Sequence, residues 1–129
     1  MIVLDSDVLI DIIDQREPAF SFVAKLQASG QVIGTTSINA AEVLRGVAPR
    51  SRAAERVARV LAALQEVPFG PVASRRFGTI MHAIDRAGAS LPVVDGLIAA
   101  ATIESGGRLL TCNVRDFGRV AGLDVIAPD

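Results

Sequence analysis

The sequence predicts a doubly wound α/β fold, in which a parallel sheet of about five short strands is flanked by helices. Short apolar, strand-like runs alternate with helical segments along the whole chain, and no repeat, low-complexity tract or interdomain linker interrupts them. This alternation is typical of a parallel sheet with helices on both faces. Half of the 129 residues are hydrophobic, which is enough for one buried core. We therefore expect residues 1–129 to form a single domain.

The first half of the chain is predicted to supply two strands and four helices. Ile2 to Leu4 reads as a buried strand, and the apolar residues that follow recur at helical spacing. Pro18 suits the first turn of the second helix, and Gly30 ends it. Ser37 is expected to cap the third helix. In chain order we expect strands at residues 2–4 and 32–35, and helices at residues 6–14, 18–30, 37–46 and 51–64.

The second half is predicted to continue the alternation with three strands and two helices. Val67 and Phe69 suggest a short strand among prolines. Pro92 opens the last helix, which ends at a pair of glycines. We expect helices at residues 73–87 and 92–106, and strands near residue 67, at residues 109–111 and at residues 125–126.

Four widely spaced acidic residues follow apolar runs or lie within them: Asp5, Glu42, Asp95 and Asp116. A carboxylate buried without a partner is costly, so such a residue usually has a reason to be there. In doubly wound sheets, ligands bind beyond the carboxyl ends of the strands, where the strand order reverses. If the first and fourth strands are neighbours, these acids meet there. The simplest ligand for them is Mg²⁺, with Mn²⁺ as an alternative, because both ions favour oxygen ligands.

Each acid also has a purely structural interpretation. Asp5 and Asp7 could cap the first helix, and Asp95 could be an ordinary first-turn acid. Glu42 could be an exposed helix residue paired with Arg45. The remaining acid, Asp116, could cap a loop.

Composition excludes several classes of site. The chain has one cysteine and one histidine, so it can form neither an internal disulfide nor a Cys/His zinc site. We expect Cys112 to be a small packed residue. No apolar run approaches the roughly 20 residues of a membrane span, and the N-terminus lacks a signal-peptide pattern. These features favour a cytoplasmic protein without a membrane partner. The mean hydropathy of +0.43 suggests an additional buried interface.

The charge distribution leaves room for a nucleic-acid substrate. The net charge is −1, but without the four candidate ligands ten acids stand against 13 basic residues, a balance of +3. Arg52, Arg56 and Arg59 form a stripe on the fourth helix, and Arg75 and Arg76 form a pair at the start of the fifth. These arginines are either a solvated helix face or a contact surface for RNA or a protein partner. With no Trp or Tyr, a base-stacking platform is not expected.

Four segments together carry a family resemblance: residues 4–11, 37–44, 91–101 and 111–117. They resemble the PIN-domain ribonucleases and, more narrowly, the VapC-type toxins of bacterial toxin–antitoxin pairs, over essentially the whole chain. The resemblance implies a PIN-like fold and a Mg²⁺-dependent endoribonuclease, a hydrolase held inactive by a cognate antitoxin. It also implies a homodimer.

The resemblance assigns the site residue by residue. The family's first three acids map to Asp5, Glu42 and Asp95. The fourth maps either to Asn113 or to Asp116, and we take Asp116 as the acid and Asn113 as a neutral helper. Many relatives carry Asn where this chain has Asp7, which adds a charge.

The implied chemistry is consistent with these residue types. Bound Mg²⁺ lowers the pKa of water and stabilises the attacking and leaving oxygens of a phosphodiester. Ser6 and Thr111 are expected to hold the ligands by hydrogen bonds. Leu9, Ile10 and Ile13, with the third and fourth helices, are the expected walls of an antitoxin groove.

Two other functions compete with this one. Residues 5–8 after an apolar strand also resemble phosphatases that use an aspartyl nucleophile, but these need a later lysine, and the only lysine here is Lys25 on an early helix. A non-catalytic PIN-fold interaction module is the other alternative. It has no use for clustered buried carboxylates.

Overall fold

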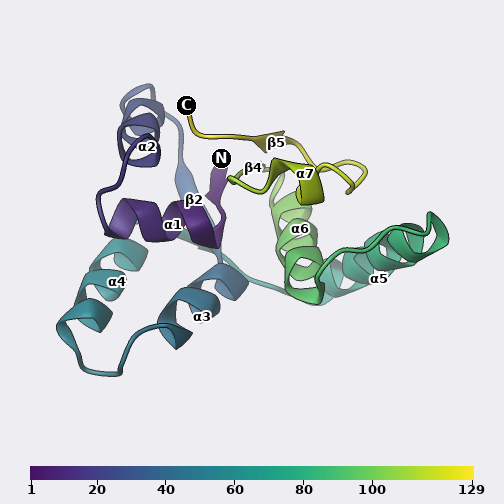
Figure 1. The fold of residues 1–129 in the computed structure, drawn as a ribbon, viewed down its shortest axis with the longest axis horizontal. Coiled ribbons are helices and arrows are strands. Elements are labelled where there is room, and N and C mark those ends of the chain that lie inside the picture. Colours follow the sequence, from purple (N-terminus) through teal and green to yellow (C-terminus); the bar gives the residue numbers. More distant parts are fainter.

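A five-stranded, fully parallel sheet forms the centre of the molecule (Figure 1), and the computed structural model describes all residues from 1 to 129. Its strands are β1 (Ile2–Leu4), β2 (Ile33–Thr36), β3 (Gln65–Val67), β4 (Arg108–Leu110) and β5 (Val125–Ile126). Their order is β3-β2-β1-β4-β5, so β1 lies between β2 and β4. The predicted fold class is confirmed. The first and fourth strands are neighbours, which is the condition under which the four acids were expected to meet.

Seven helices surround the sheet. In chain order they are α1 (Ser6–Ile13), α2 (Ala19–Ala28), α3 (Ser37–Arg45), α4 (Arg52–Ala62), α5 (Pro71–Arg86), α6 (Val93–Ser105) and α7 (Val114–Phe117). In Figure 1, α4 and α5 lie at opposite ends of the long axis of the molecule. None of the helices is long and apolar enough to cross a membrane.

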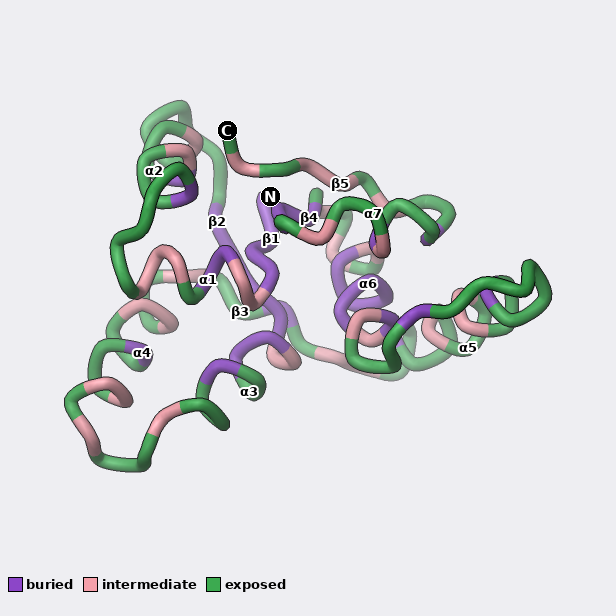
Figure 2. The backbone as a smooth tube through the Cα atoms, in the orientation of Figure 1, coloured by how far each residue is buried: buried purple, intermediate pink, exposed green.

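The alternation of side chains along β1 divides the core into two layers. Ile2 and Leu4 face a cluster formed with α1, α2, α3 and α4, whereas Val3 faces a second cluster formed with α5, α6 and α7. Successive side chains of a strand point to opposite faces, so a three-residue apolar strand can serve both layers. Figure 2 shows that the buried positions concentrate in the central strands and in α6.

The predicted element boundaries agree with the structure to within a few residues, with two corrections. The N-cap of α3 is Thr36 rather than Ser37, since the Thr36 hydroxyl accepts a hydrogen bond of 3.1 Å from the backbone N–H of Asn39. The Ser37 hydroxyl instead donates to the Glu66 carboxylate at 2.6 Å. The short helix α7 was not predicted, because four residues are too few to show a helical period.

Gly34 provides a test of the packing between β2 and β3. A Cβ atom at this position would lie 2.5 Å from the backbone oxygen of Gln65. We expect Gly34→Ala to lower the free energy of unfolding by about 1–3 kcal/mol in urea denaturation, as is typical of overpacking. The control is Gly78→Ala on α5, where an added Cβ meets no atom within 4 Å. Its stability should be unchanged or about 0.5–1 kcal/mol higher, and equal effects of the two variants would contradict this account.

Candidate active site at the carboxyl edge of the sheet

Asp5, the residue directly after β1, is a buried carboxylate with only 7% of its surface exposed. The Thr111 hydroxyl donates to its Oδ2 at 2.6 Å, and the Asn39 amide donates to its Oδ1 at 3.1 Å. Burial raises the pKa of Asp5, the hydrogen bond from Thr111 opposes this, and the charge of Asp7 adds to it. The carboxylate is therefore fixed in place at the point where the strand order reverses.

Asn39 is the residue that connects the site, and it was not among the sequence candidates. It is fully buried, and its Oδ1 accepts a 2.6 Å hydrogen bond from the Thr36 hydroxyl. Its amide donates both to Asp5 and to the Ser6 hydroxyl, the latter at 2.9 Å. The sequence feature that could have identified Asn39 is its position: a polar residue between apolar neighbours, one helical turn before Glu42.

Glu42 joins this network through Ser6. The Ser6 hydroxyl donates to Glu42 Oε1 at 2.6 Å, although Glu42 itself is exposed. Glu42 is an exposed helix residue, as its structural interpretation expected, but no ion pair links it to Arg45. A chain of hydrogen bonds therefore runs from Thr36 through Asn39 and Ser6 to Glu42.

Asp95 lies in the first turn of α6, where the charges of the other acids act on it. Its pKa is raised to about 6, first by burial and then by the charges of Asp5, Glu42, Asp116 and Asp7. Every charge that shifts it is negative. We refer to Asp5, Glu42, Asp95 and Asp116 as the acidic cluster.

Asp116 differs from the other three because the protein already supplies it with a cation. Arg119 Nη1 lies 3.2 Å from Oδ1, and the Asn113 amide donates to Oδ2 at 3.1 Å. The same Arg119 nitrogen donates to the backbone oxygen of Ser90 at 2.8 Å, and thereby ties α7 to the segment that leads into α6. Asp116 lies within α7 and does not cap a loop. Like Asn39, Arg119 was not predicted from the sequence to be a site residue.

Asp7 connects α1 to the segment after β4. Its Oδ2 accepts a 3.0 Å hydrogen bond from the backbone N–H of Cys112, and its Oδ1 accepts one of 2.7 Å from Val8. Asp5 occupies the N-cap position of α1 but makes no capping hydrogen bond, so its carboxylate serves the site instead. The expectation that Cys112 is packed is wrong, because this residue is exposed. Burial raises the pKa of its thiol, and the neighbouring Asp7 carboxylate raises it further.

The donor set of the acidic cluster fits a hard divalent cation in its chemistry. All four side chains offer carboxylate oxygens, and the raised pKa of Asp95 reflects burial together with repulsion that a cation would relieve. In the side-chain conformations of the structure, no three acidic groups are close enough together to hold one metal ion. The cluster therefore has the residues for a cation site without forming a closed cage.

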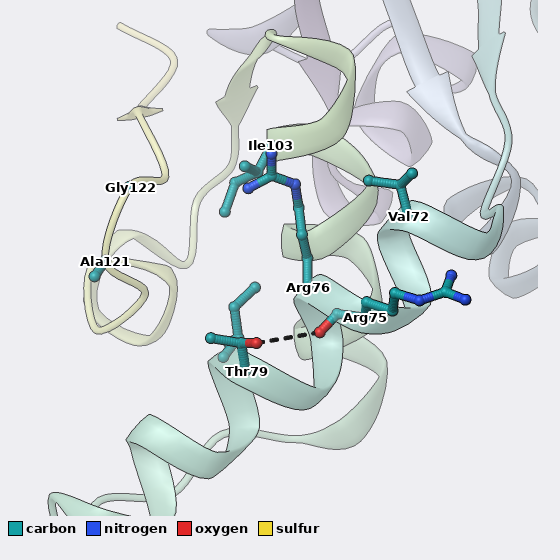
Figure 3. A pocket seen from close by; sticks show the side chains of 8 residues that line it. Val72, Arg75, Arg76, Thr79, Ile103, Ala121 and Gly122 are labelled. Carbon is teal, nitrogen blue, oxygen red and sulfur yellow. Dashed lines mark hydrogen bonds between the residues drawn. The ribbon is translucent and has the colours of Figure 1, made fainter.

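The predicted arginines lie on two separate surfaces. Arg52, Arg56 and Arg59 are exposed on α4, while Arg75 and Arg76 line a pocket of about 390 Å³ between α5, Ile103 and the loop at residues 121–122. Figure 3 shows that the Arg75 and Arg76 side chains point in different directions. These two arginines therefore do not extend the stripe on α4.

Several large apolar side chains are exposed on elements that carry the acids. Ile10 lies on α1 and Leu44 on α3, and both are at least 40% exposed. The prediction that Leu9 lines a groove is wrong, because Leu9 is fully buried in the core. Ile13 is only partly buried. The large exposed apolar residues on these elements are Ile10, Leu44, Val93, Val94 and Val114.

Comparison with known proteins gives one family and a consistent set of similar structures. The chain matches the PIN domain family over residues 2–123. A comparison with curated protein sequences finds no match. Among solved structures, this chain is similar to VapBC2 from Rickettsia felis bound to a promoter DNA fragment, with 24% identity, a TM-score of 0.84 and full coverage of both chains.

Two further structures show the same fold. DNA-bound VapBC from Salmonella typhimurium has 23% identity and a TM-score of 0.82, and covers 99% of this chain and 98% of its own. VapBC-1 from nontypeable Haemophilus influenzae has 18% identity and a TM-score of 0.84, and covers 98% of each chain. The similarity in fold extends over the whole molecule, and with the family match it shows that this chain belongs to the PIN domain family.

Proposed function

We propose that this chain is a Mg²⁺-dependent endoribonuclease, the VapC-type toxin of a cytoplasmic toxin–antitoxin pair. The observation that carries the proposal is the buried Asp5 carboxylate, which Thr111 and Asn39 hold by hydrogen bonds at the point where the strand order reverses. The pKa of Asp95, raised to about 6 by burial and by the charges of the other acids, is consistent with it. Membership of the PIN domain family supports nuclease chemistry. The VapBC complexes of similar fold support the toxin role and the antitoxin partner.

Each residue has a defined task in this function. A bound Mg²⁺, or Mn²⁺, supplies an activated water and stabilises the charge on the reacting phosphate. Asp5 and Asp95 would hold the cation, because they are the two acids of the cluster whose pKa burial and neighbouring negative charge raise. Glu42 is the candidate for orienting the water, since it is exposed and Ser6 fixes its carboxylate. Thr111 and Asn39 keep Asp5 from rotating.

The exposed apolar residues around the cluster suit an antitoxin. Ile10, Leu44 and Val93 lie on three different helices that meet at the site, so one amphipathic segment could cover them. A Lys or Arg from such a segment would satisfy the crowded carboxylates in place of the metal. The homodimer implied by the family resemblance remains part of the proposal.

The two competing functions find less support. A phosphatase nucleophile needs an accessible carboxylate, whereas Asp5 is buried and both of its oxygens accept hydrogen bonds. Lys25 is exposed on α2, which carries none of the site residues. A pure interaction module would have no reason to retain the uncompensated charge at Asp95.

Replacement of Asp5 tests the catalytic proposal. We expect Asp5→Asn to abolish cleavage of transfer and ribosomal RNA in Mg²⁺, as chelator does for the wild type, because a metal ligand is lost. Its melting temperature in chelator should be unchanged or higher, since one of several like charges is removed. Asp85→Asn, an exposed residue of α5, makes the same charge change and should cleave normally. Expression of the wild type alone should arrest growth, and expression of Asp5→Asn should not. If Asp5→Asn cleaves RNA at the wild-type rate, the metal-site proposal is refuted.

The raised pKa of Asp95 predicts a pH-dependent stability in chelator. Its folded-state pKa of about 6 exceeds the unfolded value near 3.8, so the charged form opposes folding above about pH 6. Asp95→Asn should therefore raise the melting temperature near pH 7.5, and this gain should shrink between about pH 6 and pH 4 and vanish below. Added Mg²⁺ or Mn²⁺ should stabilise the wild type more than the variant. A gain that does not change with pH would mean that side-chain shape, and not charge, is responsible.

Two substitutions can show whether Asp116 or Asn113 takes the role of the family's fourth acid. Asp116→Asn should reduce the rate of RNA cleavage by at least about 100-fold, because a carboxylate neutralises Mg²⁺ far better than an amide. Asn113→Ala should cost about 10-fold or less, since it removes only a hydrogen bond to Asp116. The reverse ranking in single-turnover kinetics would assign Asn113 as the ligand and leave the rest of the site unchanged.

A further inference from the structure

Residues 45–59 form a strongly basic segment that begins one helical turn after Glu42. Five of the chain's 13 basic residues lie in these 15 positions, with Glu55 as the only acid. We call this segment the arginine arm. It consists of the end of α3, a loop and most of α4, and its basic residues are Arg45, Arg50, Arg52, Arg56 and Arg59.

The charges of the arginine arm are not used within the protein. All five arginines are exposed, and none takes part in an ion pair or a side-chain hydrogen bond. Elsewhere, Arg16, Arg108 and Arg119 each pair with an aspartate, and the five remaining basic residues are unpaired but spread over α2, α5 and α7. Five uncompensated like charges repel one another, so an external polyanion would be strongly favoured at this surface.

The exposed face of α4 favours nucleic acid over protein. Its exposed residues are arginines, alanines and Glu55, and none of the large exposed apolar residues lies on this helix. The core of a protein–protein interface is depleted in charge and enriched in aromatic residues, whereas phosphate contacts come mainly from Arg and Lys. The exposed apolar residues near the acidic cluster lie on other helices. Arg59 also lines an apolar pocket of about 260 Å³ with Ile12 and Val23, so this side of α4 stays available as the expected wall of a partner groove. The exposed arginine face and this apolar side therefore suit different partners.

The backbone conformation of Arg50 is a second, independent observation in favour of a function for the arginine arm. Its backbone φ is +64°, in the left-handed region that favours glycine. The conformation is held by Ser51, whose hydroxyl donates to Ala48 O at 2.6 Å and accepts from the N–H of Ala54 at 3.0 Å. An arginine therefore occupies a position where glycine would be conformationally better. This points to a use for its side chain.

The arginine arm is fixed relative to the acidic cluster. Val57 of α4 is buried in one core cluster with Val8 and Leu9 of α1 and Val43 of α3. These are the helices that carry Ser6 and Glu42. Arg52 to Arg59 extend over about 10 Å along α4, given the rise of a helix, so they can contact successive phosphates of one strand.

We propose that the arginine arm binds the phosphate backbone of RNA beside the scissile bond, with Arg50 at its tip. This inference rests on the proposed ribonuclease function and names the surface that holds the substrate. Because the contacts are to phosphates, binding through the arm is sensitive to salt and largely insensitive to base sequence.

Arg50→Gly separates the side chain from the backbone. In the Asp5→Asn background, the affinity for fluorescent transfer RNA is measured against salt concentration. Arg50→Gly should bind about 4-fold more weakly near 0.15 M salt, with a salt slope smaller by about 0.7, while its melting temperature is unchanged or higher. The matched control is Gln15→Gly, because Gln15 is the other non-glycine residue with positive φ, at 55°, and is uncharged. It should leave RNA binding unchanged.

A triple substitution tests the arm as a surface. The triple variant is Arg52→Gln, Arg56→Gln and Arg59→Gln. It should reduce the slope of RNA affinity against salt concentration by about 2. The control replaces Arg75, Arg76 and Arg86 of α5, which removes the same charge at the other end of the molecule and should have a much smaller effect. Equal losses would show a net-charge effect and overturn the proposal. Unchanged RNA binding with loss of a protein partner would also overturn it, in favour of a protein surface.

The binding tests use the Asp5→Asn background, so a separate RNA cleavage assay with the unmodified chain distinguishes failure of this inference from failure of the proposed function. If the unmodified chain fails to cleave RNA in Mg²⁺, the ribonuclease proposal fails. If it cleaves RNA but the arm variants keep the full salt slope, only the assignment of the arginine arm fails.

Discussion

The burial of the Asp5 carboxylate is the constraint on which the rest of the site depends. A buried charge is tolerated only when its oxygens are satisfied, and here the donors come from Asn39 and Thr111, 34 and 106 residues further along the chain. Both donors are present only when β1 lies between β2 and β4. The strand order and the position of the carboxylate are therefore established together. No buried side-chain nitrogen or oxygen in the molecule lacks a hydrogen-bond partner, so this network leaves no unsatisfied polar atom.

The acidic cluster contains two kinds of carboxylate. Asp116 is neutralised by Arg119 and held by Asn113, whereas Asp95 is surrounded only by negative charge. A residue in the position of Asp95 lowers stability without a cation, and such residues persist where function requires them. Arg119 also contacts the segment before α6, so the compensated acid helps to place the uncompensated one.

Most of the fold could be predicted because the hydrophobic pattern is strong. The alternation of short apolar runs and helical periods predicted the five strands and their parallel arrangement, and the four acids stood out because they lie beside those runs. The order of the strands around β1 was not predicted, because it depends on pairing between distant segments. Asn39 and Arg119 could not be found in this way, because their roles depend on contacts between segments that only the folded chain brings together. Leu9 was misassigned to a groove since helical spacing identifies an apolar face but does not say whether it meets the core or a partner.

The distribution of charge links the two proposals. The total of −1 conceals an acidic centre and arginines on α4 and α5, at the two ends of the molecule (Figure 1). A phosphate backbone is attracted to the arginine arm but repelled by the acidic cluster until a cation is bound there. Cation and RNA should therefore strengthen each other's binding, and thermodynamic linkage makes this coupling equal in both directions. An antitoxin that places a basic side chain at Asp95 would compete with the cation for the same carboxylates, and would therefore exclude the metal that the proposed cleavage requires.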